Sequence, residues 1–255
     1  MCGRIVQSSS PEEIAREFGA AIDLNVQATW EPRWNAAPTS TTMIIAPHLP
    51  LRNGDAVEIH PRLLTMARWG LVPHWAKDET LGNRLFNARA ETVERLPSFR
   101  DAFKHGRVIV PINAFYEWEN PEHMEALGMH IPKRAPKQPW AFLPSQGRHF
   151  ALAGLASERT RPDGSQLRTF TLITTEANAI VGRIHDRMPA MLVTAEQRAA
   201  WLNERTSIKE IRTLLGAAPD SHLLARRVSR AVSNARNEGA HLLDAVAAEP
   251  DSLGL

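Results

Sequence analysis

The one cysteine of the chain directly follows the initiator methionine, in the sequence Met1-Cys2-Gly3-Arg4. Removal of Met1 is expected before so small a residue, and it would leave Cys2 with both a thiol and a free α-amine. The pKa of the amine is about 8 and that of the thiol about 8.5, so a fraction of each is in its nucleophilic form at neutral pH. Such a residue can act as a nucleophile with its own base, or capture an aldehyde as a Schiff base that closes to a thiazolidine. It can equally be a small apolar residue at the end of a chain.

Three further segments place polar groups among apolar residues. Asn87, Arg89 and Glu91 alternate along the chain, so their side chains would share one face of an extended strand. Glu117 lies between aromatic residues in the sequence FYEW, where it is either desolvated with a raised pKa or turned to solvent by strand alternation. His185 belongs to the sequence IHDRMP, which brings an imidazole, a carboxylate and a guanidinium together. Each segment alone is also compatible with ordinary surface residues.

Together with Cys2, these segments belong to an ordered set of motifs: MCGR, WNAAP, RWGLVPHW, NARAET, FYEW, IHDRMP and VSRAVSNARNEG. In this order they resemble the SRAP family (SOS response-associated peptidase), from Cys2 to about Ala240. The resemblance implies a single α+β domain that captures abasic sites in single-stranded DNA covalently, through a thiazolidine between Cys2 and the ring-opened sugar aldehyde. It also implies a peptidase activity that removes Met1. Whether the protein also cleaves DNA as a lyase stays open at this point.

The resemblance assigns four catalytic residues. Cys2 is the nucleophile after loss of Met1, and Asn87 of the NAR motif orients the terminal amine or the sugar hydroxyls. Glu117 of FYEW is the acid–base carboxylate near the α-amine, and His185 of IHDR transfers protons during ring opening and Schiff-base formation. These roles suit the chemistry, because imine formation first needs an unprotonated amine and then an acid that helps to expel water.

The resemblance also places six residues against DNA. An arginine offers several donors to phosphate oxygens, and a tryptophan face stacks on an unpaired base with about 1–3 kcal/mol. The set comprises Arg4, Arg89 and Arg187 at phosphates, Trp75 and Trp118 at bases, and Pro38 as a wedge in the base stack. Trp69 is expected to be a core residue instead.

Two other functions are compatible with parts of the sequence. Glutamine amidotransferases of the N-terminal nucleophile class also begin Met-Cys-Gly, so a cysteine amidohydrolase or peptidase is the main alternative. The sequence lacks motifs for the oxyanion hole and the glutamine-binding set of those enzymes. The third possibility is a single-stranded DNA-binding protein in which Cys2 is incidental. Replacing Cys2 by alanine separates these functions, since only plain DNA binding would survive it.

The elements that would hold these residues are mostly strands. Capping boxes predict helices from Pro11 to about Phe18 and from Thr194 to about Leu202, and Ser207 opens another that ends near Gly216. Strand-like segments outnumber helices and do not alternate with them, which favours an α+β fold with a largely antiparallel sheet. We expect this sheet to be barrel-like, with a few flanking helices. The predicted strands are 43–46, 63–72, 107–112, 114–118, 139–143, 150–156, 169–174 and 190–193.

We expect one domain over residues 2–244, because no linker-like stretch or internal repeat divides the chain. Two stretches, 47–61 and 120–136, are predicted to be surface excursions between strands, the second a long hairpin loop. Residues 245–255 are expected to form a loose carboxy-terminal tail.

The composition of the 255 residues, with 43% hydrophobic residues and a net charge of +2, is typical of a soluble globular protein. A single cysteine excludes internal disulfides and a multi-thiolate zinc site. The basic residues are mostly arginine, which suits phosphate contacts, although a GC-rich genome produces the same bias. No apolar run approaches the roughly 20 residues of a membrane span, and the first residues lack the basic-then-apolar layout of a secretory signal. We therefore expect a cytoplasmic monomer whose partner is single-stranded DNA with abasic sites, without a cofactor, metal or membrane.

Overall fold

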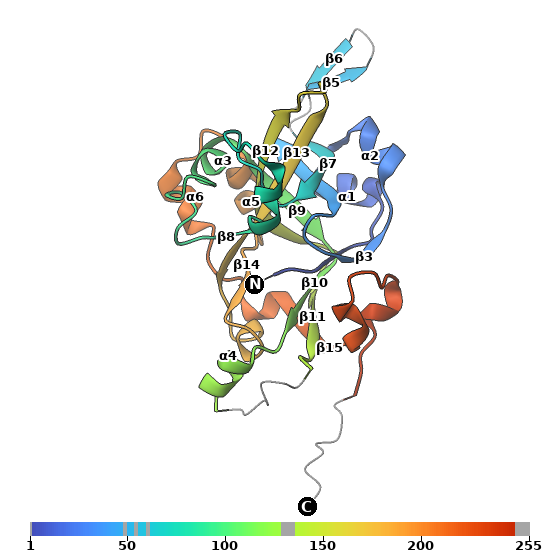
Figure 1. Cartoon of the computed structure of the whole chain (residues 1–255), viewed down its shortest axis with the longest axis vertical. Coiled ribbons are helices and arrows are strands. Elements are labelled where there is room, and N and C mark those ends of the chain that lie inside the picture. The colour runs from blue at the N-terminus through green and yellow to red at the C-terminus, as the bar shows by residue number, and fades with distance from the viewer. Residues whose placement is uncertain (1, 48–49, 54–55, 60–61, 129–135, 248–255) are drawn as a thin grey trace, which may run out of the picture.

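The longest strands form a closed barrel in the computed structural model, which describes residues 2–47, 50–53, 56–59, 62–128 and 136–247 (Figure 1). Antiparallel neighbours follow the order β13 (Gln166–Glu176), β12 (Phe150–Thr160), β9 (Arg107–Ile112), β4 (Thr41–Pro47) and β7 (Arg62–Trp69). A parallel pairing of β7 with β13, in which Arg68 lies opposite Thr169, closes the ring. Closure protects these strands from edge-to-edge pairing with other chains.

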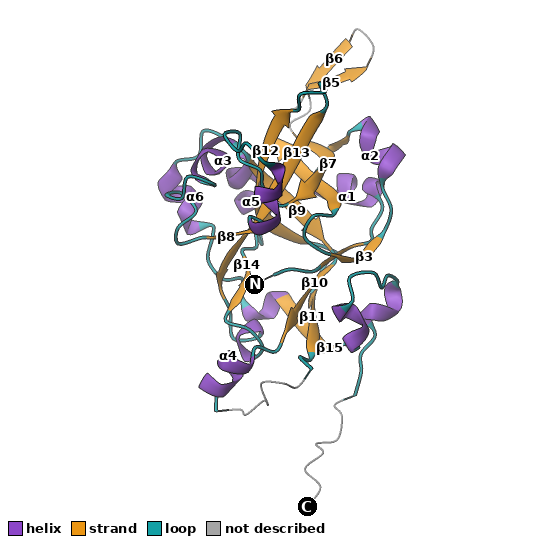
Figure 2. Ribbon diagram, viewed as in Figure 1, coloured by secondary structure: helices purple, strands orange, loops and turns teal. Residues whose placement is uncertain are grey.

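A second antiparallel sheet lies below the barrel in Figure 2. Its order is β15 (Leu223–Arg227), β11 (Pro139–Pro144), β10 (Ala114–Trp118), β1 (Ile5–Gln7) and β3 (Arg33–Ala36). Phe115 and Phe142 of this sheet stack with ring centroids 4.8 Å apart, and Phe115 meets Phe150 of the barrel at 6.0 Å. The inner face of the second sheet and the barrel therefore share one apolar core.

Short strands extend this frame. β8 (Asn87–Arg89) runs parallel to β13, and β14 (Arg187–Pro189) runs antiparallel to the same strand. These two strands matter most for the site, because Arg89 and Pro189 both lie opposite Thr174 and so flank the same end of β13. Elsewhere β2 (Ala21–Ile22) pairs with β7, and β5 (Pro50–Asn53) with β6 (Ala56–Ile59) forms a projecting hairpin within the predicted 47–61 excursion (Figure 1).

Three of the six α-helices in the described residues begin where the sequence predicts their caps. α1 (Pro11–Phe18) has the reciprocal capping box of Ser10 and Glu13, and it ends at Gly19 with a φ of 59°. α5 (Ala195–Leu202) and α6 (Ile208–Thr213) start after Thr194 and Ser207, as predicted. The six-residue helices α2 (Leu24–Thr29), α3 (Arg100–His105) and α4 (Pro121–Ala126) were not predicted. The 3₁₀ turns are η1 (Glu79–Arg84), η2 (Val181–Arg183), η3 (Asp220–His222), η4 (Arg230–Ser233) and η5 (Ala240–Leu243).

Most predicted strands are confirmed, although several of their ends move. Strands 107–112 and 114–118 coincide with β9 and β10, whereas β12 and β13 run further into a long hairpin. The predicted strand 63–72 stops at Trp69, because Gly70 has a φ of 125°. A Cβ at Gly70 would lie 2.5 Å from the carbonyl oxygen of Gly82, so the close approach of these two backbones requires glycine.

The predicted strand 190–193 is wrong, because its backbone is divided between two barrel strands. The N–H of Ala190 donates to Ile173 of β13, whereas the N–H of Leu192 donates to Ala151 of β12. This segment crosses from one strand to the next, and it forms an isolated antiparallel bridge between Met191 and Leu152 of β12 instead of a strand.

Two segments predicted to be irregular contain regular structure. The 120–136 excursion begins with α4, whose N-cap Asn120 accepts a hydrogen bond from the N–H of Glu122; residues 129–135 lie outside the described part. In the predicted tail, the N–H of Val246 donates to the carbonyl of Arg227 at 3.0 Å, and residues 248–255 lie outside the described part. The predicted fold class, a single-domain α+β fold with a barrel-like sheet, is confirmed.

Candidate active site

The pairing of β1 with β10 brings the amino-terminal segment to Glu117. Ile5 lies opposite Phe115, and in an antiparallel pair the residues before Ile5 run alongside those after Phe115. Cys2 is fully buried in the core that the barrel shares with the second sheet. Its thiol accepts a hydrogen bond from the backbone N–H of Arg4, which holds the sulfur in place.

Glu117 is desolvated, which decides between the two environments that the sequence leaves open. It lies on the same face of β10 as Phe115, toward the barrel, and is 2% exposed. Burial raises the pKa of Glu117 to about 7, and the charge of Asp186 acts in the same direction. Burial and the nearby charge of Glu117 also raise the pKa of the Cys2 thiol. At neutral pH the thiol is therefore protonated, while Glu117 is divided between its two forms.

Asn87 contacts the terminal residue from the barrel side. β8 holds it opposite Leu172 of β13, and its Nδ2 donates to the carbonyl oxygen of Cys2 at 2.7 Å. Its Oδ1 is buried and has no hydrogen-bond partner within the described residues. A buried amide oxygen in this state can accept a hydrogen bond from a bound molecule.

His185 lies between η2 and β14, with a side chain that is 14% exposed. Its Nδ1 lies 3.0 Å from the backbone N of Arg187 and 2.9 Å from Oδ1 of Asp186. A backbone N–H can only donate, so in the neutral ring Nδ1 accepts from Arg187 and the proton resides on Nε2. Burial lowers the pKa of His185 to about 4, more than Asp186 can offset. The imidazole is therefore neutral at physiological pH.

A polar hollow of about 430 Å³ opens over Glu117 and His185. Its other lining residues are Arg4, Trp118, Asn120, Lys137 and Ser233. Glu117 connects this hollow with the buried Cys2, whose pKa its charge raises. The hollow thus contains two groups: a carboxyl group that gains and loses a proton near neutral pH, and a neutral imidazole. This arrangement is suited to acid–base catalysis.

One wall of the hollow includes Ser233, which belongs to the segment 228–239. Arg4 donates to the carbonyl of Val232 at 2.7 Å and to that of Ser233 at 3.2 Å. Its guanidinium lies 5.7 Å from the ring centroid of Trp118, whose Nε1 donates to the hydroxyl of Ser233 at 2.9 Å. Arg4 and Trp118 therefore line the hollow together, with much of their hydrogen-bonding capacity taken up by the protein.

Asn35 organises this wall, and the sequence interpretation did not single it out. It is 1% exposed, and its Oδ1 accepts from Arg4 at 2.8 Å. Its Nδ2 lies 3.0–3.1 Å from the carbonyl oxygens of Val232, Asn234 and Asn237. Asn35 belongs to WNAAP and its acceptors to VSRAVSNARNEG, so both motifs carried a signal for this contact.

Comparisons with known proteins identify the family of this chain. Residues 1–235 match the family described as SOS response associated peptidase (SRAP). The chain belongs to the SRAP family. It is 32% identical over 245 residues to the abasic site processing protein YoqW of Bacillus subtilis (strain 168), covering 96% of this chain and 99% of that protein. YoaM, an abasic site processing protein of the same strain, is 34% identical over 247 residues, covering 96% and 98%.

A more distant relative is the abasic site processing protein YedK of Escherichia coli (strain K12), 26% identical over 250 residues, covering 96% of this chain and 100% of that protein. A crystal structure of a Bacteroides thetaiotaomicron protein has a TM-score of 0.78 at 23% identity and covers 96% of this chain and 100% of its own. At that identity the likeness shows the shared fold.

The SRAP motif arginines Arg89 and Arg187 have different surroundings. Arg187 is 12% exposed and makes a bidentate ion pair with Glu91, at 2.6 and 3.0 Å, and a 2.7 Å hydrogen bond to the carbonyl of Thr174. Arg89 is exposed at the end of β8. The predicted shared face of residues 87, 89 and 91 ends early, because β8 stops at Arg89 and the chain turns so that Glu91 reaches Arg187.

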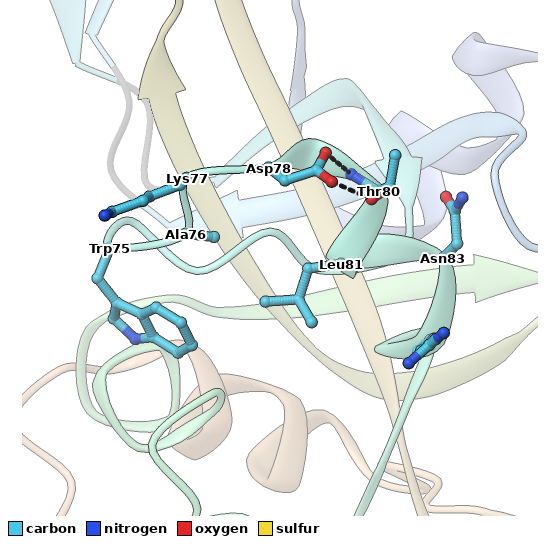
Figure 3. Close-up of a pocket in the computed structure, with 8 residues that line it drawn as sticks. Trp75, Ala76, Lys77, Asp78, Thr80, Leu81 and Asn83 are labelled. Carbon is cyan, nitrogen blue, oxygen red and sulfur yellow. Dashed lines mark hydrogen bonds between the residues drawn. The ribbon is translucent and has the colours of Figure 1, made fainter.

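The remaining predicted DNA-binding residues of this SRAP domain lie outside the hollow lining. Trp75 is 50% exposed at the rim of a separate depression of about 560 Å³, which Figure 3 shows together with Leu81 and Asn83. Pro38 lies in the turn between β3 and β4. Trp69 is fully buried and stacks on Phe170, as expected for a core residue.

Neither a metal site nor a membrane span emerges from the part of the chain that the structure describes. No group of three or more histidine, cysteine, aspartate or glutamate residues there could hold a metal ion. No helix in the same residues is long and apolar enough to cross a membrane.

Proposed function

We propose that this SRAP protein captures abasic sites in single-stranded DNA by forming a thiazolidine between Cys2 and the sugar aldehyde. The observation that carries the proposal is that Glu117 and His185 line one hollow, while the charge of Glu117 acts on the buried Cys2, whose carbonyl accepts a hydrogen bond from Asn87. The printed names of the relatives support the same substrate class, since each is an abasic site processing protein.

The first stage of the reaction is a condensation. After removal of Met1, the α-amine of Cys2 adds to the aldehyde carbon of the ring-opened sugar, and the resulting carbinolamine loses water to give an iminium ion. Expulsion of water needs a proton, which Glu117 can donate because its pKa is about 7. Asn87 holds the carbonyl of Cys2 and so orients the amine, while its buried Oδ1 offers an acceptor to a sugar hydroxyl.

The second stage closes the ring. The sulfur of Cys2 adds to the iminium carbon, its proton passes to the Glu117 carboxylate, and the nitrogen becomes a neutral ring amine. Because burial raises the pKa of the thiol, this step depends on a nearby base rather than on a preformed thiolate. Opening of the sugar ring moves a proton between its hydroxyl and ring oxygen, and the neutral imidazole of His185 is suited to that transfer. The net change is the loss of one water molecule.

Single-stranded DNA is the substrate form that we propose, because a duplex would bury the aldehyde carbon. Arg4 and Trp118 line the hollow, Arg89 is exposed nearby on β8, and Trp75 offers an exposed ring for base stacking. Arg187 could reach a phosphate only by exchanging its contact with Glu91. Pro38 is retained as the proposed wedge on the turn after β3.

The test uses untagged protein, with loss of Met1 confirmed by intact mass, and a single-stranded oligonucleotide that carries one abasic site. A heat-resistant band on a denaturing gel, with a mass equal to protein plus DNA minus one water, is the expected product. Cys2→Ala and a chain that retains Met1 behind a tag should both give no band. Wild-type protein that gives no band but hydrolyses small amides would overturn the proposal in favour of a cysteine amidohydrolase.

A further inference from the structure

The hollow over Glu117 contains three groups that can carry positive charge, and they differ in what they already bind. Arg4 is half-buried, with its guanidinium bonded to Asn35, Val232 and Ser233 and stacked over Trp118. His185 is neutral at physiological pH, because burial lowers its pKa to about 4. The third group is the ammonium of Lys137.

Lys137 is held at the rim by rigid neighbours. Antiparallel pairing of β10 with β11 continues past the strand ends, where the N–H of Glu119 donates to the carbonyl of Gln138 at 3.0 Å. This pairing places Lys137 beside Asn120, and both line the hollow. Gln138 is buried, and its Nε2 donates to the carbonyl of Val228 at 2.8 Å, which anchors the backbone next to Lys137.

Lys137 is exposed to solvent. No hydrogen bond or ion pair engages Lys137 among the described residues. The carboxylate of Glu119, just beyond β10, accepts a hydrogen bond from Trp140 at 3.0 Å. A solvated ammonium at the rim of a hollow, next to an acid–base pair, has the chemistry of a phosphate-binding group.

We propose that Lys137 binds a phosphate of the substrate strand next to the sugar that enters the hollow. This inference rests on the proposed function. It adds Lys137 to the DNA-binding residues that were predicted from the sequence. It explains how the substrate strand is held although Arg4 and Arg187 are both engaged within the protein. Lys137 acts as a binding residue, and it takes no part in the transfer of protons.

The first experiment measures binding of an undamaged single-stranded oligonucleotide as a function of salt for wild type, Lys137→Gln and Lys209→Gln. Lys209 is an exposed lysine of α6 that lines none of the hollows described above, so its variant controls for the loss of one positive charge. Each phosphate contact contributes a slope of about 0.7 in log K against log salt for single strands. Lys137→Gln should reduce the slope by about 0.7 and weaken binding several-fold at low salt, whereas Lys209→Gln should change neither.

The second experiment compares capture of 2-deoxyribose and 2-deoxyribose 5-phosphate by mass spectrometry. Both sugars react through an aldehyde but differ in their ring equilibria, so the change in their rate ratio between wild type and Lys137→Gln reports phosphate recognition by Lys137. Lys137→Gln should lower the preference for the phosphorylated sugar several-fold, because the rate with 2-deoxyribose 5-phosphate falls much more than the rate with 2-deoxyribose. An unchanged preference together with an unchanged salt slope would overturn the proposal.

Two further results would distinguish a failure of the proposed thiazolidine chemistry from a failure of the role assigned to Lys137. If wild-type protein captures neither sugar, the proposed thiazolidine chemistry fails, whereas loss of phosphate preference alone concerns Lys137. If borohydride traps an abasic oligonucleotide on Cys2→Ala protein but not on a Cys2→Ala/Lys137→Gln protein, Lys137 reacts with the aldehyde as an amine. That outcome would overturn its assignment as a phosphate-binding residue.

Discussion

Replacing Glu117 by glutamine should stabilise the protein at alkaline pH and leave its stability nearly unchanged at acidic pH. In the unfolded chain the carboxyl ionises near its ordinary pKa of 4.5, whereas burial raises the pKa of Glu117 in the folded protein to about 7. Between these values the folded state holds a proton that the unfolded state has lost, so the free energy of unfolding falls as the pH rises. Below pH 4.5 the Glu117 carboxyl is protonated in both the folded and the unfolded state, and above about pH 7 it is ionised in both.

The size of the effect follows from the width of that interval. The separation between 4.5 and about 7 corresponds to about 3 kcal/mol, at about 1.4 kcal/mol for each pH unit. Glu117 is 2% exposed, so solvent screening reduces this figure little. The free energy of unfolding of Glu117→Gln minus that of wild type should therefore rise from near zero at about pH 4.5 to about 3 kcal/mol at about pH 8.

The assay is unfolding in urea, monitored by tryptophan fluorescence at several pH values. The comparison requires that the free energy of unfolding falls with urea concentration at the same slope in both proteins. The difference between the two proteins is the informative quantity, because His185 titrates in the opposite sense. Its pKa is lowered from 6.5 to about 4, so it adds stability as the pH rises through that window and partly cancels the contribution of Glu117 in wild type. Glu119→Gln is the matched control, since it removes a carboxylate just beyond β10 but keeps an amide oxygen for Trp140.

A stability difference that stays flat between about pH 5 and 8 would refute the argument that burial raises the pKa of Glu117. So would a Glu117→Gln protein that is less stable than wild type at about pH 8. On the proposed function, the same substitution should slow crosslinking by about 10²- to 10⁴-fold, because it removes the acid–base group. A gain in stability together with a loss of activity would identify Glu117 as a group kept for chemistry at the expense of folding.

Other predictions follow from single contacts. Glu91→Ala should lower the free energy of unfolding by about 1–2 kcal/mol in urea titrations, because it leaves the mostly buried guanidinium of Arg187 with one partner fewer; the exposed half of Glu91 limits the effect. An unchanged midpoint would contradict this. Asn87→Ala should slow crosslinking at least tenfold while binding of undamaged DNA stays constant, since its Nδ2 contacts the carbonyl of Cys2; parallel losses would make Asn87 merely structural. Arg107→Met should reduce stability by about 3 kcal/mol or more, measured as a lower Tm, because the buried guanidinium donates to four backbone carbonyls. A small change would mean that water replaces it.

Features that depend on a few neighbouring residues could be predicted from the sequence. The capping boxes at Ser10 and Thr194 predicted the starts of α1 and α5, because a cap is satisfied within one turn. Helix α3 was missed, since its N-cap residue Phe99 makes no side-chain cap hydrogen bond. The predicted strand 190–193 failed because its hydrogen-bond partners, on β12 and β13, lie far away in the sequence.

The environment of the proposed catalytic groups could not be predicted from neighbouring residues in the sequence. Strand alternation around Glu117 leaves burial undecided, because the answer depends on what covers each face of β10. The arginine of IHDR likewise has the same donors whether it meets phosphate or Glu91, and only the turn after β8 brings that carboxylate within 2.6 Å. Lys137 carried no motif signal at all, and its placement follows from the pairing of β10 with β11.

The sequence by itself determined where α1, α5 and α6 begin, since a helix cap depends on a few neighbouring residues. Through the order of its motifs it also predicted the residues proposed for the chemistry, which are Cys2, Asn87, Glu117 and His185. The tertiary structure decided that these groups meet, that the carboxyl group titrates near neutral pH, and that the imidazole stays neutral. The physical reason is that desolvation and hydrogen bonding depend on every element that surrounds a group, and here those elements come from both ends and the middle of the chain.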